Sequence, residues 1–263
     1  MTDDSPFTLE RRADGVGLLT LDRPAIHNAF DDHLIATLTD ALLAIGADDG
    51  IRVLLLTGRG RSFSAGADLN WMRRSADYGE ADNLKDARAL AKLMTTLDSL
   101  PRPTIAKVNG AALGGGVGLV CCCDIAIAAD HARFGTTEVK LGIMPSVIGP
   151  YVLRAIGARA ARRIMLTGER FDAAEALRLG LVHQVASAEA LDGAVETVIA
   201  DLLSSGPSAV QATKALIRDL AGAAISPDLV DETARRIAAL RSTPEAKEGL
   251  GAFLEKRPPS WRT

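Results

Sequence analysis

The sequence predicts a layered α/β fold followed by a helical C-terminal region. Strand-like segments alternate with amphipathic helical segments through roughly the first two thirds of the 263 residues, an alternation that is typical of α/β layer architectures. Two of the strand-like segments run into glycine-bearing turns, and the last third of the chain is helical in pattern. We therefore divide the chain into an α/β core, residues 1–195, and a helical region, residues 196–263.

The first elements of the core follow from local patterns. Residues 7–12 and 16–21 are predicted to be two strands of a hairpin, because an Asp-Gly pair lies between them. Residues 31–48 carry apolar side chains at helical spacing, with two aspartates near the start. Residues 52–57 form a β-branched and leucine-rich run that indicates a buried strand.

The next elements surround a cluster of glycines. Residues 81–100 are predicted to be an amphipathic helix that stops at Pro101, and residues 104–108 a strand. A short apolar helix follows the glycines, and residues 124–129 again form a strand. The remaining segments are all helical in pattern: 146–157, 158–167, 173–179, 191–203, 208–220 and 228–254.

Composition and charge exclude several classes of protein. Hydrophobic residues make up 48% and charged residues 24% of the chain, a globular balance that excludes wholesale disorder. The net charge of −3 argues against nucleic acid or an anionic membrane as the main partner. No secretory signal and no apolar run of membrane-spanning length is visible. The adjacent Cys121, Cys122 and Cys123 lack disulfide or zinc spacing, so we expect buried small residues in a reducing, cytoplasmic setting.

Glycine-rich turns follow two of the predicted strands, within residues 56–68 and 108–116. Glycine allows a positive φ and the close approach of another group. If a helix begins near Gly115, its unpaired amides point outward at the positive end of the helix dipole, where they bind anions or stabilise a developing oxyanion. The sequence contains no Walker-type phosphate loop, dinucleotide fingerprint or nucleophile elbow. Its four histidines show no metal-ligand spacing.

Together, these turns and three further segments resemble the crotonase superfamily, also called the enoyl-CoA hydratase/isomerase family. The segments occur in the family's order over nearly the whole chain: LDRPAIHNAF (21–30), GRSFSAGADL (60–69), PTIAKVNGAALGGGVGL (103–119), ARFGTTEVKLGIMP (132–145) and GAFLEKRPP (251–259). The resemblance implies a spiral of ββα units that binds a CoA thioester. It also implies C-terminal helices that assemble trimers, or hexamers made of two trimers.

The resemblance implies a catalytic site with one carboxylate. The amides of Ala65 and Gly115 match the oxyanion hole, which grips the thioester oxygen and stabilises the enolate. Many hydratases of the family carry two glutamates. Glu138 matches one of them, whereas Gly118 stands where the other would fall. We therefore expect Glu138 to move the protons, with a pKa raised by an apolar pocket. No metal or redox cofactor is implied, because coenzyme A enters as part of the substrate.

Further residues match positions that bind the substrate in this family. The Ser-Ala-Gly-Ala-Asp loop matches the adenine and pantetheine cradle, and Phe253 and Lys256 match tail positions that meet the adenine and phosphate end, often across a subunit boundary. For Lys256, an exposed lysine without a role is an equally good interpretation. For Met72, Met144, Val147 and Ile148, the alternatives are an acyl pocket and ordinary core packing. The full set implied to bind substrate is Arg23, Ala25, Ser64, Ala65, Gly66, Ala67, Asp68, Leu69, Met72, Leu113, Gly114, Gly115, Met144, Phe253 and Lys256.

A finer resemblance concerns residues 64–72, 118–130 and 136–163. These are similar to the bacterial methylglutaconyl-CoA hydratases and their isohexenylglutaconyl-CoA relatives, a branch that also tends to carry glycine where the first glutamate would be. It implies hydration in leucine or acyclic-terpene breakdown, on substrates with a distal carboxylate. Arg73, Arg74 and Lys140 are candidate partners for that carboxylate, although a solvated helix surface is the commoner fate of such side chains.

We therefore expect an acyl-CoA hydratase that adds water across the 2,3 double bond of an α,β-unsaturated thioester. A Δ3-Δ2-enoyl-CoA isomerase is the first alternative, because it passes through the same enolate. The second is a CoA-ester-binding or RNA-binding protein with little catalysis, although the sequence shows no basic stripe for RNA.

Overall fold

A six-stranded sheet forms the centre of the core in the computed structural model, which describes residues 5–262. β1 is antiparallel to β2, and all other neighbours in this sheet are parallel. In sheet order the strands are β1 (Phe7–Arg11), β2 (Val16–Leu21), β3 (Val53–Gly58), β5 (Thr104–Val108), β7 (Ile125–Ala129) and β10 (Gln184–Ala186). The first five confirm the predicted strands. β10 was not predicted, because three residues are too few to show a periodic pattern.

A second sheet is built from short strands that the sequence pattern also did not predict. They are β4 (Ser62–Ser64), β6 (Ala111–Leu113), β8 (Arg133–Gly135) and β9 (Phe171–Asp172), of which the first three are parallel. β4, β6 and β8 each follow a strand of the large sheet and precede a helical segment, so the chain repeats a ββα unit three times. Since the carboxyl ends of parallel strands lie at the same edge of a sheet, the loops after β4, β6 and β8 meet there.

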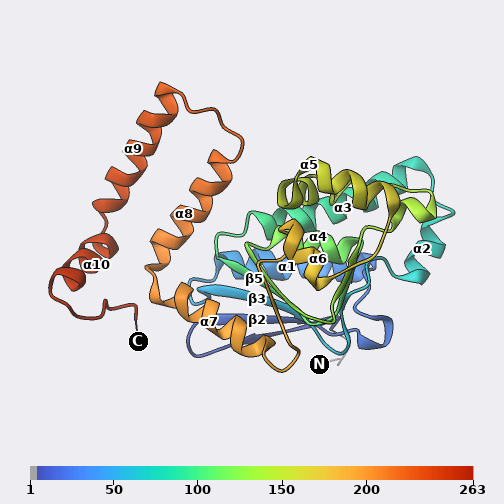
Figure 1. Cartoon of the computed structure of the whole chain (residues 1–263), viewed down its shortest axis with the longest axis horizontal. Coiled ribbons are helices and arrows are strands. Elements are labelled where there is room, and N and C mark those ends of the chain that lie inside the picture. Colours follow the sequence, from blue (N-terminus) through green and yellow to red (C-terminus); the bar gives the residue numbers. More distant parts are fainter. Residues whose placement is uncertain (1–4, 263) are drawn as a thin grey trace.

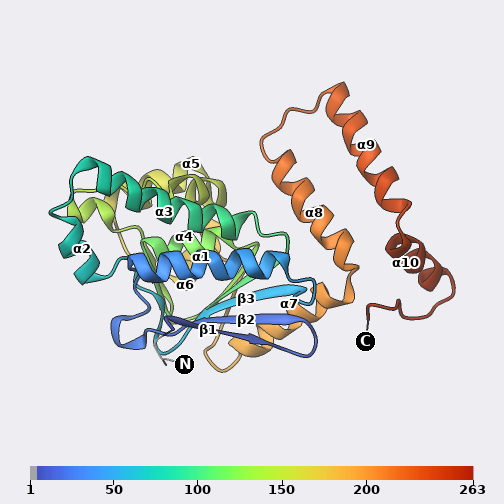
Figure 2. The ribbon, with the colours of Figure 1, turned by 180° about the vertical axis from the view of Figure 1, so that it is seen from behind.

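Helices cover both faces of the large sheet (Figures 1 and 2). Because successive side chains of a strand point to opposite faces, Leu54 and Leu56 of β3 join the main core cluster, and Val53 and Leu55 join a second cluster. α7 (Leu191–Ser204) packs against the second cluster. The helices of the main cluster are α1 (Asp32–Ala47), α3 (Glu80–Asp98), α4 (Gly115–Cys122), α5 (Gly149–Thr167) and α6 (Ala173–Leu179).

The last three helices form an arm that stands away from the core (Figures 1 and 2). They are α8 (Pro207–Leu220), α9 (Pro227–Arg241) and α10 (Pro244–Leu254). The single helix predicted over 228–254 is wrong, because Pro244 has no N–H to continue α9 and the hydroxyl of Thr243 caps a new helix at Ala246 N–H. The boundary predicted at residue 195 falls inside α7, and the arm begins only after that helix.

Short helical segments border the loops after β4 and β8. They are α2 (Leu69–Ser75), η2 (Glu138–Leu141) and, earlier in the chain, η1 (Pro24–Ile26). None of the helices within residues 5–262 has the length and apolar character needed to cross a membrane. The prediction about a secretory signal draws partly on residues 1–4, which lie outside the described residues.

Candidate active site

Three loops of the small sheet, here named the catalytic loops, bring the predicted catalytic residues together. The loop after β4 carries Ala65 to Ala67, the turn after β6 carries Gly114, and the loop after β8 leads to Glu138. The parallel pairing of Ser64 with Ala112 sets the first two loops side by side. The amide of Gly114 donates to the carbonyl of Gly135 at 2.9 Å and so ties the second loop to the third.

Two glycines allow the loops to touch. Gly66 has a φ of +84°, and a Cβ at this position would lie 2.8 Å from the carbonyl oxygen of Leu113. Gly114 has a φ of +51°, and a Cβ there would lie 3.2 Å from Oε1 of Glu138. Larger residues would therefore be strained in both backbones. The second distance also shows that the Glu138 carboxyl lies directly beside the turn that begins α4.

Glu138 is a half-buried carboxyl with one unsatisfied oxygen. Its Oε2 is buried, and no hydrogen-bond partner for it occurs among the described residues. Burial raises the pKa of Glu138 above the usual glutamate range, because the charged form loses hydration. A carboxyl with a free oxygen and a raised pKa holds and releases a proton closer to neutral pH than an ordinary glutamate, which suits a general acid–base group.

The raised pKa also predicts how stability depends on pH. Ionisation of Glu138 costs more free energy in the folded than in the unfolded chain. The stability that the protonated carboxyl contributes is therefore fully present below the unfolded-state pKa and is lost as the pH rises through the folded-state pKa. Glu138→Gln avoids this loss. We expect a melting temperature roughly 2–4 °C above that of the wild type at pH 8, and no difference near pH 4, where the carboxyl is protonated. Thermal unfolding across this range checks the prediction, and an equal difference at both pH values would contradict it.

Two backbone amides beside Glu138 are free to bind an oxygen. Gly115 is the first residue of α4, so its N–H has no acceptor within the helix. Ala67 lies opposite Phe30 in an isolated β-bridge, whose two hydrogen bonds run from Phe30 N–H to Gly66 O and from Asp68 N–H to Phe30 O. The N–H of Ala67 takes part in neither bond and has no acceptor within residues 5–262. Free amides at a helix N-terminus and in an adjoining loop are suitable donors to an oxyanion.

The structure contradicts the predicted role of the Ala65 amide. This N–H donates to the carbonyl of His27 at 2.9 Å and so ties the loop after β4 to the segment that follows η1. Gly66 bends the loop between the two alanines with a φ of +84°, so the directions of their amides depend on this turn and the sequence motif alone does not tell which alanine presents a free N–H. In the structure it is Ala67.

Two polar residues of the same loop shape it and do not reach its surface. Ser64 is fully buried, and its hydroxyl donates to the carbonyl of Asn28 at 2.9 Å. Asp68 is buried and caps α2 by accepting hydrogen bonds from the amides of Asn70 and Trp71. In this structure both side chains are engaged within the protein, so binding of substrate by Ser64 and Asp68 stays a prediction that concerns their backbone.

The other predicted residues fall into three groups. Those near the loops are at least partly exposed: Ala67, Leu69, Met72, Leu113, Gly114, Gly115 and Met144. Arg23 and Ala25 lie at η1, where the Arg23 guanidinium donates to Ala29 O at 2.7 Å and pairs with Asp31. Phe253 and Lys256 lie at the end of the arm, on the side of the chain away from α2 (Figure 1). A single chain therefore does not bring these two residues to the loops.

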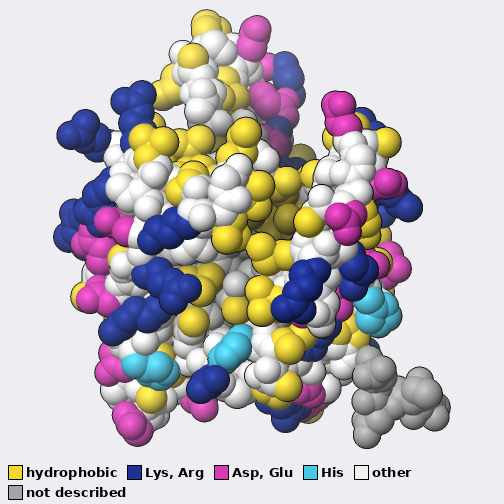
Figure 3. Space-filling view, turned by 90° about the vertical axis from the view of Figure 1, so that its right-hand side faces the viewer, with side chains coloured by type: hydrophobic (Ala, Val, Ile, Leu, Met, Phe, Trp, Pro, Cys, Tyr) yellow, Lys and Arg dark blue, Asp and Glu magenta, His cyan; other side chains and the backbone are white. Residues whose placement is uncertain are grey.

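The face that carries α2 is hollowed and apolar. Figure 3 shows hydrophobic side chains around a hollow on this face, with Lys and Arg side chains beside it. Large hydrophobic residues next to the catalytic loops are strongly exposed, namely Leu69, Leu141, Ile143 and Met144. Exposed apolar groups gathered in this way are typical of a ligand or partner surface.

The three cysteines lie away from these loops. They are buried, and burial raises the pKa of Cys121 and Cys123 to about 12, which makes thiolate chemistry unfavourable. They line a cavity of about 330 Å³ between α8 and the core, together with Asp124 and Lys214. No set of three His, Cys, Asp or Glu side chains within residues 5–262 is arranged to hold a metal ion.

Comparison with known proteins places this site in a family. Residues 11–263 match the family model described as enoyl-CoA hydratase/isomerase. The chain belongs to the enoyl-CoA hydratase/isomerase family. Its fold is the crotonase fold. The crystal structure of an enoyl-CoA hydratase from Shewanella pealeana is 46% identical, with a TM-score of 0.94 over 98% of this chain and 97% of the other.

The names of two relatives in the family illustrate its range. The 2,3-dehydroadipyl-CoA hydratase of Escherichia coli is 37% identical over 95% of this chain and 96% of its own length. The crotonyl-CoA hydratase of Syntrophomonas wolfei is 36% identical over 92% of both chains. Their near-equal identities show that overall similarity does not select one acyl group.

Proposed function

We propose that the protein hydrates the 2,3 double bond of an α,β-unsaturated acyl-CoA thioester. The observation that carries this proposal is the meeting of two free amides, Ala67 and Gly115, with the half-buried carboxyl of Glu138 at one edge of the small sheet. The names of the family relatives support it, because both act on enoyl-CoA substrates as hydratases.

The mechanism follows from the chemistry of an enolate. The thioester oxygen accepts hydrogen bonds from Ala67 and Gly115, which stabilise the negative charge that develops on it. The Glu138 carboxylate takes a proton from water as the water oxygen bonds to C3, and the electrons of the double bond move toward the carbonyl. Glu138 then delivers this proton to C2, and the carboxylate is restored. Both steps move only protons and electron pairs among water, Glu138 and the thioester, so neither requires a metal ion or a redox group.

One observation also favours the Δ3-Δ2-enoyl-CoA isomerase as a second candidate. Besides Asp68, which caps α2, Glu138 is the one carboxylate within residues 64–69, 110–118 and 135–138. An isomerase needs a single group, which takes a proton from C2 and returns it at C4. The same amides would stabilise the enolate of this reaction.

Two substrates separate the candidates. We expect the purified protein to consume crotonyl-CoA, with loss of the absorbance of the conjugated enoyl thioester and formation of 3-hydroxybutyryl-CoA. A gain of this absorbance from a 3-enoyl-CoA, with no loss from crotonyl-CoA, would instead support the isomerase. No change with either substrate, and none with branched or dicarboxylic enoyl-CoA thioesters, would contradict both.

A methylglutaconyl-like substrate is a finer part of the proposal. Adipyl and glutaconyl groups each have a second carboxylate, so the relative named for 2,3-dehydroadipyl-CoA supports a site of this kind. Among the predicted cations, Arg74 pairs with Asp32 at 2.7 Å, whereas Arg73 donates a hydrogen bond to Asn70 of its own helix and, like Lys140, forms no ion pair within residues 5–262. Arg73 and Lys140 are therefore the candidates for the distal carboxylate. A reducing, cytoplasmic setting stays a prediction.

The arm supports a homotrimer, or a hexamer of two trimers. Large hydrophobic side chains are exposed along it: Ile217, Ile225, Val230, Ile237, Leu250, Phe253 and Leu254. Apolar surface of this extent is typical of subunit interfaces. In such an assembly, Phe253 and Lys256 would serve the CoA site of a neighbouring subunit.

A further inference from the structure

Position 118 lies on the side of α4 that adjoins the catalytic loops. Gly118 is three residues after Gly115, so both lie on the same face of the helix. The side chains of helical residues point toward the N-terminus and cover the preceding turn. A side chain at position 118 would therefore extend toward Gly115, whose amide is free, and toward Gly114, which adjoins Glu138.

That space is filled by two apolar side chains from other helices. A Cβ on Gly118 would clash with Cγ2 of Ile148, the residue before α5, and would lie 3.1 Å from both Cε and Sδ of Met94 in α3. Ile148 is 2% exposed and Met94 is fully buried. The bare face of Gly118 is thus covered by hydrocarbon and sulfur, with no room for another side chain.

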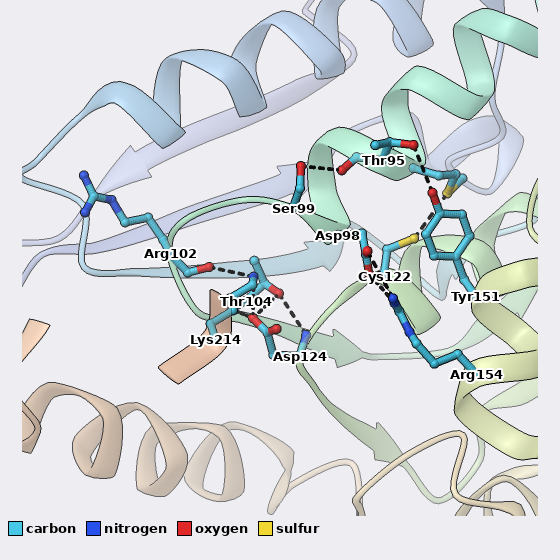
Figure 4. Close-up of polar contacts among 11 residues, drawn as sticks. Thr95, Asp98, Ser99, Arg102, Thr104, Cys122, Asp124, Tyr151, Arg154 and Lys214 are labelled. Atoms are coloured by element: carbon cyan, nitrogen blue, oxygen red, sulfur yellow. Dashed lines mark hydrogen bonds and ion pairs between the residues drawn. The ribbon is translucent and has the colours of Figure 1, made fainter. Parts of the chain in front are cut away.

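Polar contacts between α3 and α5 hold the two side chains in place. The hydroxyls of Thr95 and Tyr151 lie 3.0 Å apart, one residue beyond Met94 and three beyond Ile148 (Figure 4). One turn further along, Asp98 pairs with Arg154, with Nη1 to Oδ2 at 3.2 Å. Cys122 lies one turn after Gly118 and contacts Met94 through sulfur at 3.8 Å. α3 and α5 are therefore fastened to each other across α4.

We propose that Met94 and Ile148 act as an apolar plug that determines which proton transfers the site can perform. The plug keeps a second acid–base side chain, and the water that such a side chain would hold, away from the first turn of α4. Glu138 then acts alone. This inference rests on the proposed function, because it concerns the same enolate site. The plug is held in position by two polar pairs, Thr95 with Tyr151 and Asp98 with Arg154.

A double-mutant cycle tests the plug without any need for activity. Alanine normally stabilises a helix relative to glycine, yet we expect Gly118→Ala to lower the melting temperature by about 5 °C because it overpacks the site. In the Ile148→Ala background the same change should be neutral or should raise the melting temperature. Gly118→Ala that is harmless in both backgrounds would overturn the plug.

The functional part is tested with a carboxylate at position 118. We expect Gly118→Glu alone to fold poorly, and Gly118→Glu with Ile148→Ala to fold and to hydrate crotonyl-CoA at least about tenfold faster than Ile148→Ala alone, since a positioned acid–base group contributes about 10²-fold or more. Gly118→Gln with Ile148→Ala has the same size but carries an amide that acts neither as a general acid nor as a general base, so it should show no gain. As a control, Ile164→Ala removes a buried isoleucine within α5 and should leave the ratio of crotonyl-CoA hydration to exchange of the C2 hydrogens unchanged.

The outcomes separate the two proposals. Equal hydration by the folded Glu and Gln variants would overturn the assignment of the plug as the element that limits proton transfer. If neither double variant folds, the outcome of the Gly118→Ala cycle decides whether the plug exists. A wild-type protein that neither hydrates enoyl-CoA thioesters nor exchanges C2 hydrogens would contradict the proposed function, whereas the stability cycle would still stand.

Discussion

Glu138→Gln is expected to reduce kcat/KM for hydration by about 10³-fold, within the range for loss of a general acid–base group. Its affinity for a saturated acyl-CoA is expected to be unchanged. The reason is that the amide has nearly the same shape as the carboxyl but cannot carry a proton between water and C2. The free amides of Ala67 and Gly115, which we propose to bind the thioester oxygen, are untouched by this change. Steady-state kinetics with crotonyl-CoA and calorimetry with butyryl-CoA measure the two quantities.

Glu10→Gln is a matched control for this variant. Glu10 is an exposed glutamate of β1, outside the three catalytic loops, so the same chemical change there should leave kcat/KM as it is. If Glu138→Gln also left kcat/KM unchanged, Glu138 would not be the proton-transfer group, and a protein that merely binds CoA esters would become the better account.

Replacement of the Ala67 amide by an ester is expected to lower kcat by about 10²–10³-fold, the loss found when one oxyanion donor is removed. Incorporation of lactic acid at position 67 exchanges the N–H for an oxygen atom and keeps the methyl side chain. This N–H has no acceptor within residues 5–262, so the cost in stability should be limited to the weaker acceptor that an ester makes of the Gly66 carbonyl, which binds Phe30 N–H. Kinetics with crotonyl-CoA and thermal unfolding together check both expectations.

The same substitution at Ala65 provides the contrast. The Ala65 N–H donates to His27 O at 2.9 Å, so its removal should cost about 0.5–1.5 kcal/mol of folding free energy and should affect kcat far less than the ester at 67. If the ester at position 65 instead gave the larger kinetic loss, the assignment of Ala67 in place of Ala65 would be wrong.

Local patterns were sufficient for the long elements and insufficient for the short ones. Helices such as α1 contain enough residues for their apolar periodicity to show, and strands such as β3 show as continuous apolar runs. β4, β6 and β8 have three residues each, and tertiary pairing rather than local preference creates them. They nevertheless set the positions of the catalytic loops.

The site itself was predictable at the level of loops and not at the level of atoms. The resemblance led to Glu138 and Gly115, which the structure brings to one edge of the small sheet. It led to Ala65 where the structure presents the amide of Ala67, because hydrogen bonding with His27 and Phe30 decides which N–H is free. The filling of the space at Gly118 depends on Met94 and Ile148, each more than 20 residues away along the chain. Such contacts leave no local signal in the sequence.

The most direct test of the central claim is a crystal structure with acetoacetyl-CoA, whose enolate resembles the proposed intermediate. The account predicts that the thioester oxygen lies about 2.7–3.1 Å from the amide nitrogens of both Ala67 and Gly115, with a carboxyl oxygen of Glu138 within hydrogen-bond reach of the reacting carbons or of a water beside them. A thioester oxygen that contacts neither amide, or a Glu138 carboxyl turned away from the bound acyl group, would contradict it.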